Sequence, residues 1–240
     1  MIVEICSNSV ESACSAQKGG ADRIELCAEL EVGGITPSYG VIKRVVEKLS
    51  IPVFVLIRPR SGNFTYTHAE FETMKEDIKF CREIGCKGIV SGVLNQDNTL
   101  DAERTKELIE LARPLSFTFH RAFDWVPNPD ETMKNLIGLG CDRVLTSGQQ
   151  SKALDGLPLL TVLQYKYGKN IKIMPGSGID EQNVLNFKEN GFIEIHFSAS
   201  VPVKVLKVPP PISFNNNAFD ESFVKKSDQN KIWQIVNKVK

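Results

Sequence analysis

The sequence has no excess of either charge and no long apolar run. Lysine plus arginine and aspartate plus glutamate number 29 each among the 240 residues, so the formal net charge is zero. Without a basic stripe, nucleic-acid binding is not expected. The apolar runs fall far short of the roughly 20 residues that span a bilayer. Because a strand-like run starts at Ile2, where a charged leader would stand, we expect no signal peptide, no membrane binding and a cytoplasmic location.

Short metal-binding motifs are also missing. The six cysteines form no C-x-x-C pair, and His68, His120 and His196 lie far apart in the sequence. These spacings exclude a zinc ribbon and other local metal motifs. In a reducing cytoplasm the cysteines should be free thiols. A metal site would therefore have to be assembled from distant segments by folding.

What the sequence does have is a series of short apolar runs that end abruptly in polar residues. Residues 2–6 lead into Ser-Asn, 53–57 into Arg-Pro-Arg, 117–119 into His-Arg, 144–145 into Thr-Ser-Gly and 193–195 into His-Phe-Ser. When many strands end in reactive side chains, their C-terminal ends are expected to converge on one site, as in a parallel α/β barrel. The chain length is close to the about 250 residues typical of such barrels.

Strand and helix patterns alternate along the chain. The expected strands are at residues 2–6, 23–26, 51–57, 88–90, 116–119, 143–145, 171–174 and 193–197. The expected helices between them are at residues 11–18, 38–49, 67–84, 101–113, 130–139, 152–167 and 180–189. This order predicts an α/β protein with a parallel sheet, a single TIM-type (β/α)8 barrel over residues 1–200.

The C-terminal segment, residues 201–240, has a different pattern. Residues 203–211 are rich in valine, lysine and proline, and three asparagines follow. We expect an irregular, partly mobile segment over residues 201–219 and an extra C-terminal helix over residues 221–239. The apolar positions of that helix share one face. This face would pack either on the exterior of the barrel or, less simply, against another subunit.

The first two strands repeat a Glu-x-Cys pattern. Alternation along a strand places Glu4 and Cys6 on one face, and Glu25 and Cys27 on the same face of the neighbouring strand. The apolar residues between them should face the helices. Both carboxylates and both thiols are therefore expected to point into the barrel.

Carboxylates inside a barrel need partners, because burial of an unpaired charge is costly. Arg58 and Arg60, after the third strand, are inward candidates by the same alternation. Two interpretations stay open: a Glu–Arg network that only holds the barrel together, or functional groups at its mouth. The second interpretation is stronger for Glu25, which lies nearer the rim than Glu4.

The two thiols lie at the ends of adjacent strands. Cys6 and Cys27 could supply two sulfur ligands, and soft thiolates select Cu(I) among common metals. The alternative is a pair of inert, buried cysteines. The stagger between the two strands decides whether the sulfur atoms meet.

The densest group of reactive residues follows the fifth strand. His120 has an ordinary pKa near 6.5, which suits proton transfer. Arg121 can bind a carboxylate or phosphate through two nitrogens, and Asp124 can orient either neighbour. His120, Asp124 and Glu25 are therefore the candidate catalytic residues. A purely structural role for His120 is the alternative.

Two loops late in the sequence fit an anion site. Gly176, Ser177 and Gly178 follow the seventh strand, and His196 and Ser198 lie at the end of the eighth. Phosphate sites of barrels are often built from these two loops, where glycine exposes backbone N–H groups. The Gly-Ser-Gly run also fits an ordinary tight turn.

Ser147, after the sixth strand, could join this anion site. Arg58, Arg60 and Arg121 would add positive charge at the same end of the barrel. The expected ligand is a small anion.

These segments together resemble the CutC family of copper homeostasis proteins over roughly residues 1–200. The likeness rests on Glu4-Ile5-Cys6, Arg23-Ile24-Glu25-Leu26-Cys27, Gly34-Ile35-Thr36-Pro37-Ser38, Arg58-Pro59-Arg60 with Phe64 and Tyr66, Phe119-His120-Arg121-Ala122-Phe123-Asp124, Leu145-Thr146-Ser147-Gly148 and Glu194-Ile195-His196.

The resemblance implies a TIM-type barrel, a cytoplasmic location, a homodimer or higher homo-oligomer, and Cu(I) binding by Cys6 and Cys27. Ser7-Asn8 stands where relatives usually carry an aspartate after the cysteine, which weakens any role for an acid at position 8.

Two functions remain open from the sequence. The first is a CutC-like protein of copper homeostasis that binds Cu(I). The second is a barrel enzyme that acts on a small anionic or phosphorylated metabolite by acid–base chemistry. A barrel that serves as a scaffold for a partner is a third, non-catalytic alternative.

Overall fold

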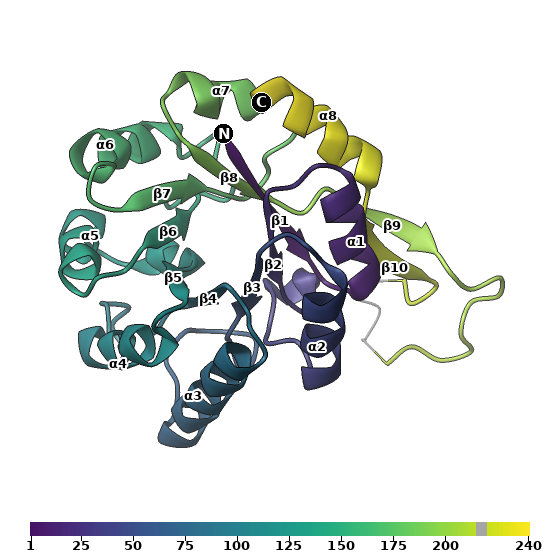
Figure 1. The fold of residues 1–240 in the computed structure, drawn as a ribbon, viewed down its shortest axis with the longest axis horizontal. Helices are drawn as coiled ribbons and strands as arrows, with labels where there is room; N and C mark the ends of the chain where they lie inside the picture. Colours follow the sequence, from purple (N-terminus) through teal and green to yellow (C-terminus); the bar gives the residue numbers. More distant parts are fainter. Residues whose placement is uncertain (215–219) are drawn as a thin grey trace.

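All eight expected strands form, and they belong to one parallel sheet. The computed structural model describes residues 1–214 and 220–240, and its sheet has the order β7-β6-β5-β4-β3-β2-β1-β8 (Figure 1). The strands are β1 (Ile2–Ser7), β2 (Arg23–Leu26), β3 (Val53–Leu56), β4 (Gly88–Ser91), β5 (Ser116–Phe119), β6 (Arg143–Thr146), β7 (Lys172–Pro175) and β8 (Glu194–Phe197). A parallel bridge between Gly176 and His196 joins the two ends of the sheet, so that it is nearly a closed barrel.

The helices cover the outside of the barrel. They are α1 (Val10–Lys18), α2 (Tyr39–Lys48), α3 (His68–Glu83), α4 (Ala102–Ala112), α5 (Pro129–Gly138), α6 (Leu157–Tyr167) and α7 (Val184–Glu189). Local signals explain several starts: Thr67 and Glu70 form a capping box for α3, and proline opens α5. Within the described residues, no helix has the length and apolar character needed to cross a membrane.

Side chains along each strand alternate between two cores. Val3 and Ile5 of β1, like Ile24 and Leu26 of β2, are fully buried in the large core between sheet and helices. Cys6 and Cys27 belong to a second, smaller cluster with Phe54, Leu56 and Val90. The predicted alternation is therefore confirmed: the apolar residues face the helices, and the Glu-x-Cys residues face the barrel interior.

A layer of ion pairs fills the interior below the thiols. The Arg23 guanidinium bridges Glu4 of β1 and Glu194 of β8, with 2.5 Å between Arg23 Nη2 and Glu194 Oε2. Arg143 of β6 pairs with the same Glu194 and donates to Thr118 Oγ1 at 3.1 Å.

Each guanidinium of this layer also lies over the Phe54 ring, at 5.1 Å for Arg23 and 5.4 Å for Arg143. Arg23 Nη2 additionally donates to the sulfur of Met174 at 3.2 Å. The two cations are therefore packed against an aromatic face and a thioether as well as paired with carboxylates.

Electrostatics keep these buried acids ionised. Burial alone would raise the pKa of Glu4, but the charge of Arg23 and the hydrogen bond from His196 outweigh it and lower that pKa to about 2. The pKa of Glu194 is also lowered, because Arg143 and Arg23 outweigh its burial. The structural interpretation of Glu4, as part of a Glu–Arg network, is supported by these contacts, but its arginines are Arg23 and Arg143 and not the expected Arg58 and Arg60.

The C-terminal segment departs from the prediction in its details. Ser200–Lys204 (β9) and Phe223–Ser227 (β10) pair as an antiparallel ribbon, and the last helix, α8, spans Gln229–Val239. The expected helix start at 221 was wrong because Phe223–Ser227 finds a strand partner, while Asp228 caps the helix. Residues 215–219 of the predicted irregular segment lie outside the described residues.

Helix α8 packs on the barrel and takes the place of its eighth helix. It lies between α7 and α1 (Figure 1), and Ile232, Ile235, Val236 and Val239 are its buried face. The ideal Cβ position of Gly19, at the end of α1, is only 2.7 Å from Ile232. This close approach explains why a residue without a side chain stands there.

The charged layer predicts a large effect of Glu194→Gln on stability. The substitution removes the carboxylate shared by Arg23 and Arg143, and breaking a buried ion pair from one side costs about 3–5 kcal/mol. Urea unfolding should show this loss. Glu47→Gln, which removes the exposed Lys43–Glu47 pair of α2, should cost about 1 kcal/mol or less. Equal losses for the two variants would contradict a dominant role of the layer.

Candidate functional site

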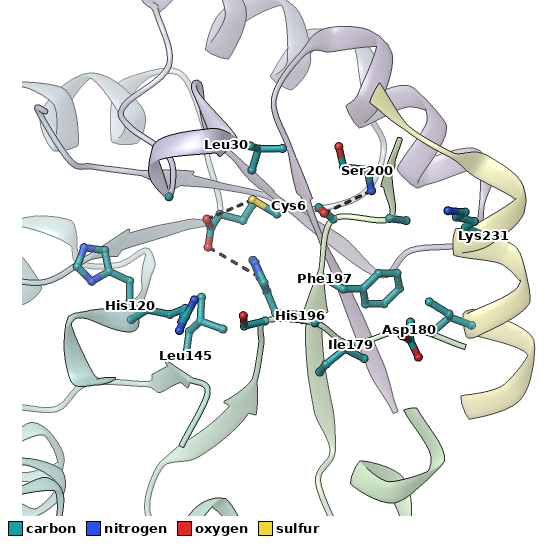
Figure 2. Close-up of a pocket in the computed structure, with 18 of the residues that line it drawn as sticks. Cys6, Leu30, His120, Leu145, Ile179, Asp180, His196, Phe197, Ser200 and Lys231 are labelled. Carbon is teal, nitrogen blue, oxygen red and sulfur yellow. Dashed lines mark hydrogen bonds and ion pairs between the residues drawn. The ribbon is translucent and has the colours of Figure 1, made fainter. Parts of the chain in front are cut away.

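A cavity of about 660 Å³ opens at the C-terminal ends of the strands. It is lined from strands far apart in the sequence, and Glu25, Arg58, His120 and His196 all border it. Figure 2 shows Cys6 and His196 near its centre, with His120 and Lys231 on opposite sides of the view. The expected meeting of reactive side chains at one mouth therefore occurs, although their chemical roles stay predictions.

The two thiols meet at the base of this cavity. The sulfur atoms of Cys6 and Cys27 are 3.5 Å apart, and both cysteines are free. Cys6 borders the cavity and Cys27, fully buried, lies behind it. The hydrogen bond to Cys27, burial and the nearby Glu25 carboxylate raise the pKa of Cys6 well above its usual value. The thiol form of Cys6 is therefore favoured in the absence of a bound cation.

Next to the thiols lies a chain of two carboxylates and an imidazole. His196 Nδ1 is 2.8 Å from Glu4 Oε1 and 4.0 Å from Glu25 Oε2, and Cys6 Sγ donates to Glu25 Oε1 at 3.8 Å. Burial raises the pKa of Glu25 to about 7, although the positive charge of His196 opposes this. Burial would lower the pKa of His196, but Glu25, Cys6 and Glu4 together hold it above its usual range.

Cys6, Glu25 and His196 could also act together on a cation. One ligand atom from each lies within 4.8 Å of the others. The sequence placed His196 only in the anion site and missed this group. The signal was present, because Glu194 and His196 repeat on β8 the inward alternation seen on β1, and His196 pairs with Glu4 in register.

The two predicted arginines of the third strand have different positions. Arg58 is buried and donates to the carbonyl oxygens of Val32, Gly34 and Gly62 at 2.9, 2.8 and 2.7 Å. It borders the cavity, and its contacts hold the surrounding loops together.

Arg60, expected to point inward, lies outside the cavity. It pairs with Glu70 at 2.6 Å and lies over the Tyr66 ring. The alternation fails at this position because β3 ends at Leu56, four residues before Arg60.

His120 borders the cavity, and its surroundings move its pKa away from the ordinary value near 6.5. Burial, together with the charges of Arg58 and Arg121, lowers the pKa of His120 to about 3. The ring is therefore neutral near pH 7. Its Nδ1 accepts the backbone N–H of Ala122 at 3.2 Å, which places the proton on Nε2.

Asp124 and Ser147 lie behind the cavity wall and hold Arg121. Asp124 Oδ2 accepts from Arg121 Nε at 2.7 Å, and Ser147 Oγ accepts from Arg121 Nη2 at 2.9 Å. Thr146 Oγ1 and the backbone N–H of Ser147 also donate to Asp124. Asp124 thus orients the arginine, one of the two neighbours considered for it, while Arg121 itself borders the cavity.

The two late loops reach the cavity in part. Ser177, Gly178 and Ser198 border it, with His196. Gly176 does not, because it forms the bridge to His196 that closes the barrel and its ideal Cβ position would lie 2.5 Å from Leu145.

The sequence also missed part of the wall. Lys231, Gln234 and Ile235 of α8 border the cavity, which the local pattern of the helix could not show. Their positions follow from the packing of α8 between α7 and α1.

Comparisons with known proteins agree with this fold. A family model described as the CutC family matches residues 1–201. A CutC family protein of Salmonella agona is 44% identical over 228 residues, which cover 95% of this chain and 90% of the relative. A crystal structure of a candidate copper homeostasis protein CutC from Streptococcus agalactiae has a TM-score of 0.78 and 32% identity, and the match covers 82% of this chain and 98% of that one.

More distant structures share the barrel only. Thiamine phosphate pyrophosphorylase of Pyrococcus furiosus has a TM-score of 0.61 at 14% identity, with 99% of this chain and 96% of that one covered. At that identity the likeness shows the fold and carries nothing about chemistry. The family model covers residues 1–201, and the Salmonella relative is 44% identical. These two matches show that this chain belongs to the CutC family.

Proposed function

We propose that this protein takes part in copper homeostasis by binding Cu(I) through Cys6 and Cys27. The single observation that carries the proposal is the 3.5 Å separation of two free sulfur atoms beside a cavity. Thiolate sulfur is the ligand type that Cu(I) prefers. The S. agalactiae relative, described as a candidate copper homeostasis protein, supports the same assignment.

The donor set fits a soft cation that arrives from the cavity. Cys6 faces the cavity and Cys27 lies behind it, so the metal ion would meet Cys6 first and would then be shared by both sulfurs. His196 and Glu25 lie close enough to Cys6 to add a nitrogen or an oxygen donor. A cytoplasmic location is part of the proposal, because both thiols must stay reduced.

The thiol protons must leave when the metal ion binds. Because the pKa of Cys6 is raised, its proton is still bound near pH 7 and is displaced by the cation. Glu25 Oε1 accepts from Cys6, and Glu25 borders the cavity, so this carboxylate can take that proton and release it to solvent.

Cys27→Ser tests the proposed copper ligands. Loss of one of two sulfur ligands should weaken Cu(I) binding by more than the roughly 10- to 100-fold typical of changes beside a metal site. Competition with a Cu(I) chelator of known affinity measures this. Cys141→Ser is the matched control, because Cys141 is also a buried free thiol but donates to the backbone oxygens of Phe117 and Arg143. Unchanged affinity of Cys27→Ser would remove the proposed site.

The affinity for Cu(I) should also depend on pH. A raised thiol pKa means that Cu(I) competes with a proton, so affinity should rise as pH rises. The expected slope is about tenfold per pH unit for each proton displaced, over the range below the thiol pKa. The same competition, repeated between about pH 6 and 8 and corrected for protonation of the chelator, measures the slope. An affinity independent of pH would contradict displacement of a thiol proton.

A further inference from the structure

The thiol pair uses only one wall of the cavity. Its volume of about 660 Å³ far exceeds what one ion needs and lies within the roughly 300–1,000 Å³ of small-molecule sites. His120 and Arg121 also border the cavity, and no part of the copper proposal uses them. These two residues have the features of a site for an organic ligand.

His120 offers a fixed hydrogen-bond donor. Since its Nδ1 accepts from Ala122, the proton lies on Nε2, and Nε2 is buried without a partner among the residues that the structure describes. The ring packs against Phe64, with 4.8 Å between centroids, so it cannot readily turn to another acceptor. Buried polar groups are almost always hydrogen-bonded, so an N–H left unpaired beside a cavity indicates a missing acceptor.

Arg121 places a cation beside that donor. Asp124 and Ser147 hold its Nε and Nη2. The side chain is 42% exposed, so Nη1, which donates to none of the described residues, is open to solvent and to a ligand. The guanidinium is therefore held in place with one nitrogen left to donate. A charged donor of this kind favours a carboxylate or phosphate oxygen.

Glu25 offers an acceptor in the same cavity. Its Oε2 is also buried and has no hydrogen-bond partner in the described part of the chain; its ion-pair partner, His196 Nδ1, is 4.0 Å away. The cavity is thus bordered by free donors and by an acceptor that still lacks a hydrogen bond. One small molecule that has both an anionic oxygen and a hydroxyl or amino group would pair with all of them.

We propose that the cavity binds a small hydroxylated or aminated organic anion. Its carboxylate or phosphate oxygen accepts from His120 Nε2–H and Arg121, and its hydroxyl or amino group donates to Glu25. The anion-binding residues, His120 and Arg121, have no part in the copper proposal, although Glu25 lies beside both sites. Failure of one proposal therefore leaves the other intact.

The test follows the imidazole resonances of His120 by NMR in the full-length protein. The probes are glycerol 3-phosphate, glycerate and inorganic phosphate. A saturable shift of the His120 Nε2–H signal is expected with glycerol 3-phosphate or with glycerate, and the one that binds identifies the anionic group. Inorganic phosphate, which lacks the hydroxylated carbon chain, should bind more weakly than glycerol 3-phosphate.

Variants of two arginines distinguish anion binding at Arg121 from nonspecific anion binding elsewhere on the protein. Arg121→Met should weaken binding by about tenfold or more, as expected for the loss of a charged hydrogen bond. Arg60→Met is the matched control, because Arg60 also follows a strand of the barrel but pairs with Glu70 outside the cavity. This variant should bind the ligand as the unaltered protein does. Arg121→Lys keeps the charge but loses the forked donor, and it provides the same comparison if Arg121→Met does not fold.

Two outcomes would overturn the proposal. One is the absence of a saturable His120 shift with all three probes. The other is equal affinity in the unaltered protein, Arg121→Met and Arg121→Lys, which would mean that the anion binds elsewhere. Measurement on the copper-free protein keeps both outcomes independent of metal binding.

Discussion

The structure depends on the neutralisation of charge inside the barrel. Arg23 and Arg143 are buried, and they are tolerable only because Glu4 and Glu194 stay ionised beside them. These side chains come from β1, β2, β6 and β8, so the layer joins strands on both sides of the barrel closure. His196 extends the layer upward through Glu4. The site at the mouth lies directly on this layer, so the charges of the layer influence the pKa values of the site's ionisable groups.

This electrostatic influence explains why two neighbouring carboxylates have different pKa values. Glu4 touches Arg23 and His196, and its pKa falls to about 2, whereas Glu25, one level higher, is dominated by burial and its pKa rises to about 7. The hydrogen bond to Cys27, together with burial, keeps the proton on Cys6. Ionised groups thus form the floor, while the protonated Cys6 thiol and Glu25, whose pKa is about 7, lie beside the cavity. This division fits a site where a cation replaces protons.

Much of this arrangement could be predicted from the sequence, where the signals are local. Alternation in Glu4-Ile5-Cys6 and its repeat on the next strand correctly placed the carboxylates and thiols inside, and Thr67 marked a helix start. The errors arose where tertiary packing decides. Arg60 follows the end of its strand, and β9 pairs with β10 across a long intervening segment, from Phe223↔Lys204 to Ser227↔Ser200. The lowered pKa of His120 comes from burial and two arginines, so neither its protonation nor the contribution of α8 to the wall has a local signature.

The layer beneath the thiols also limits the route by which a ligand can reach them. The paired arginines and glutamates, with Phe54 under both guanidiniums, fill the barrel from below. The cavity is therefore a blind vestibule and not a channel through the barrel. A metal ion that reaches Cys27 must enter and leave past Cys6 and the rim of the cavity. A molecule bound in the cavity would therefore block access to the deeper thiol.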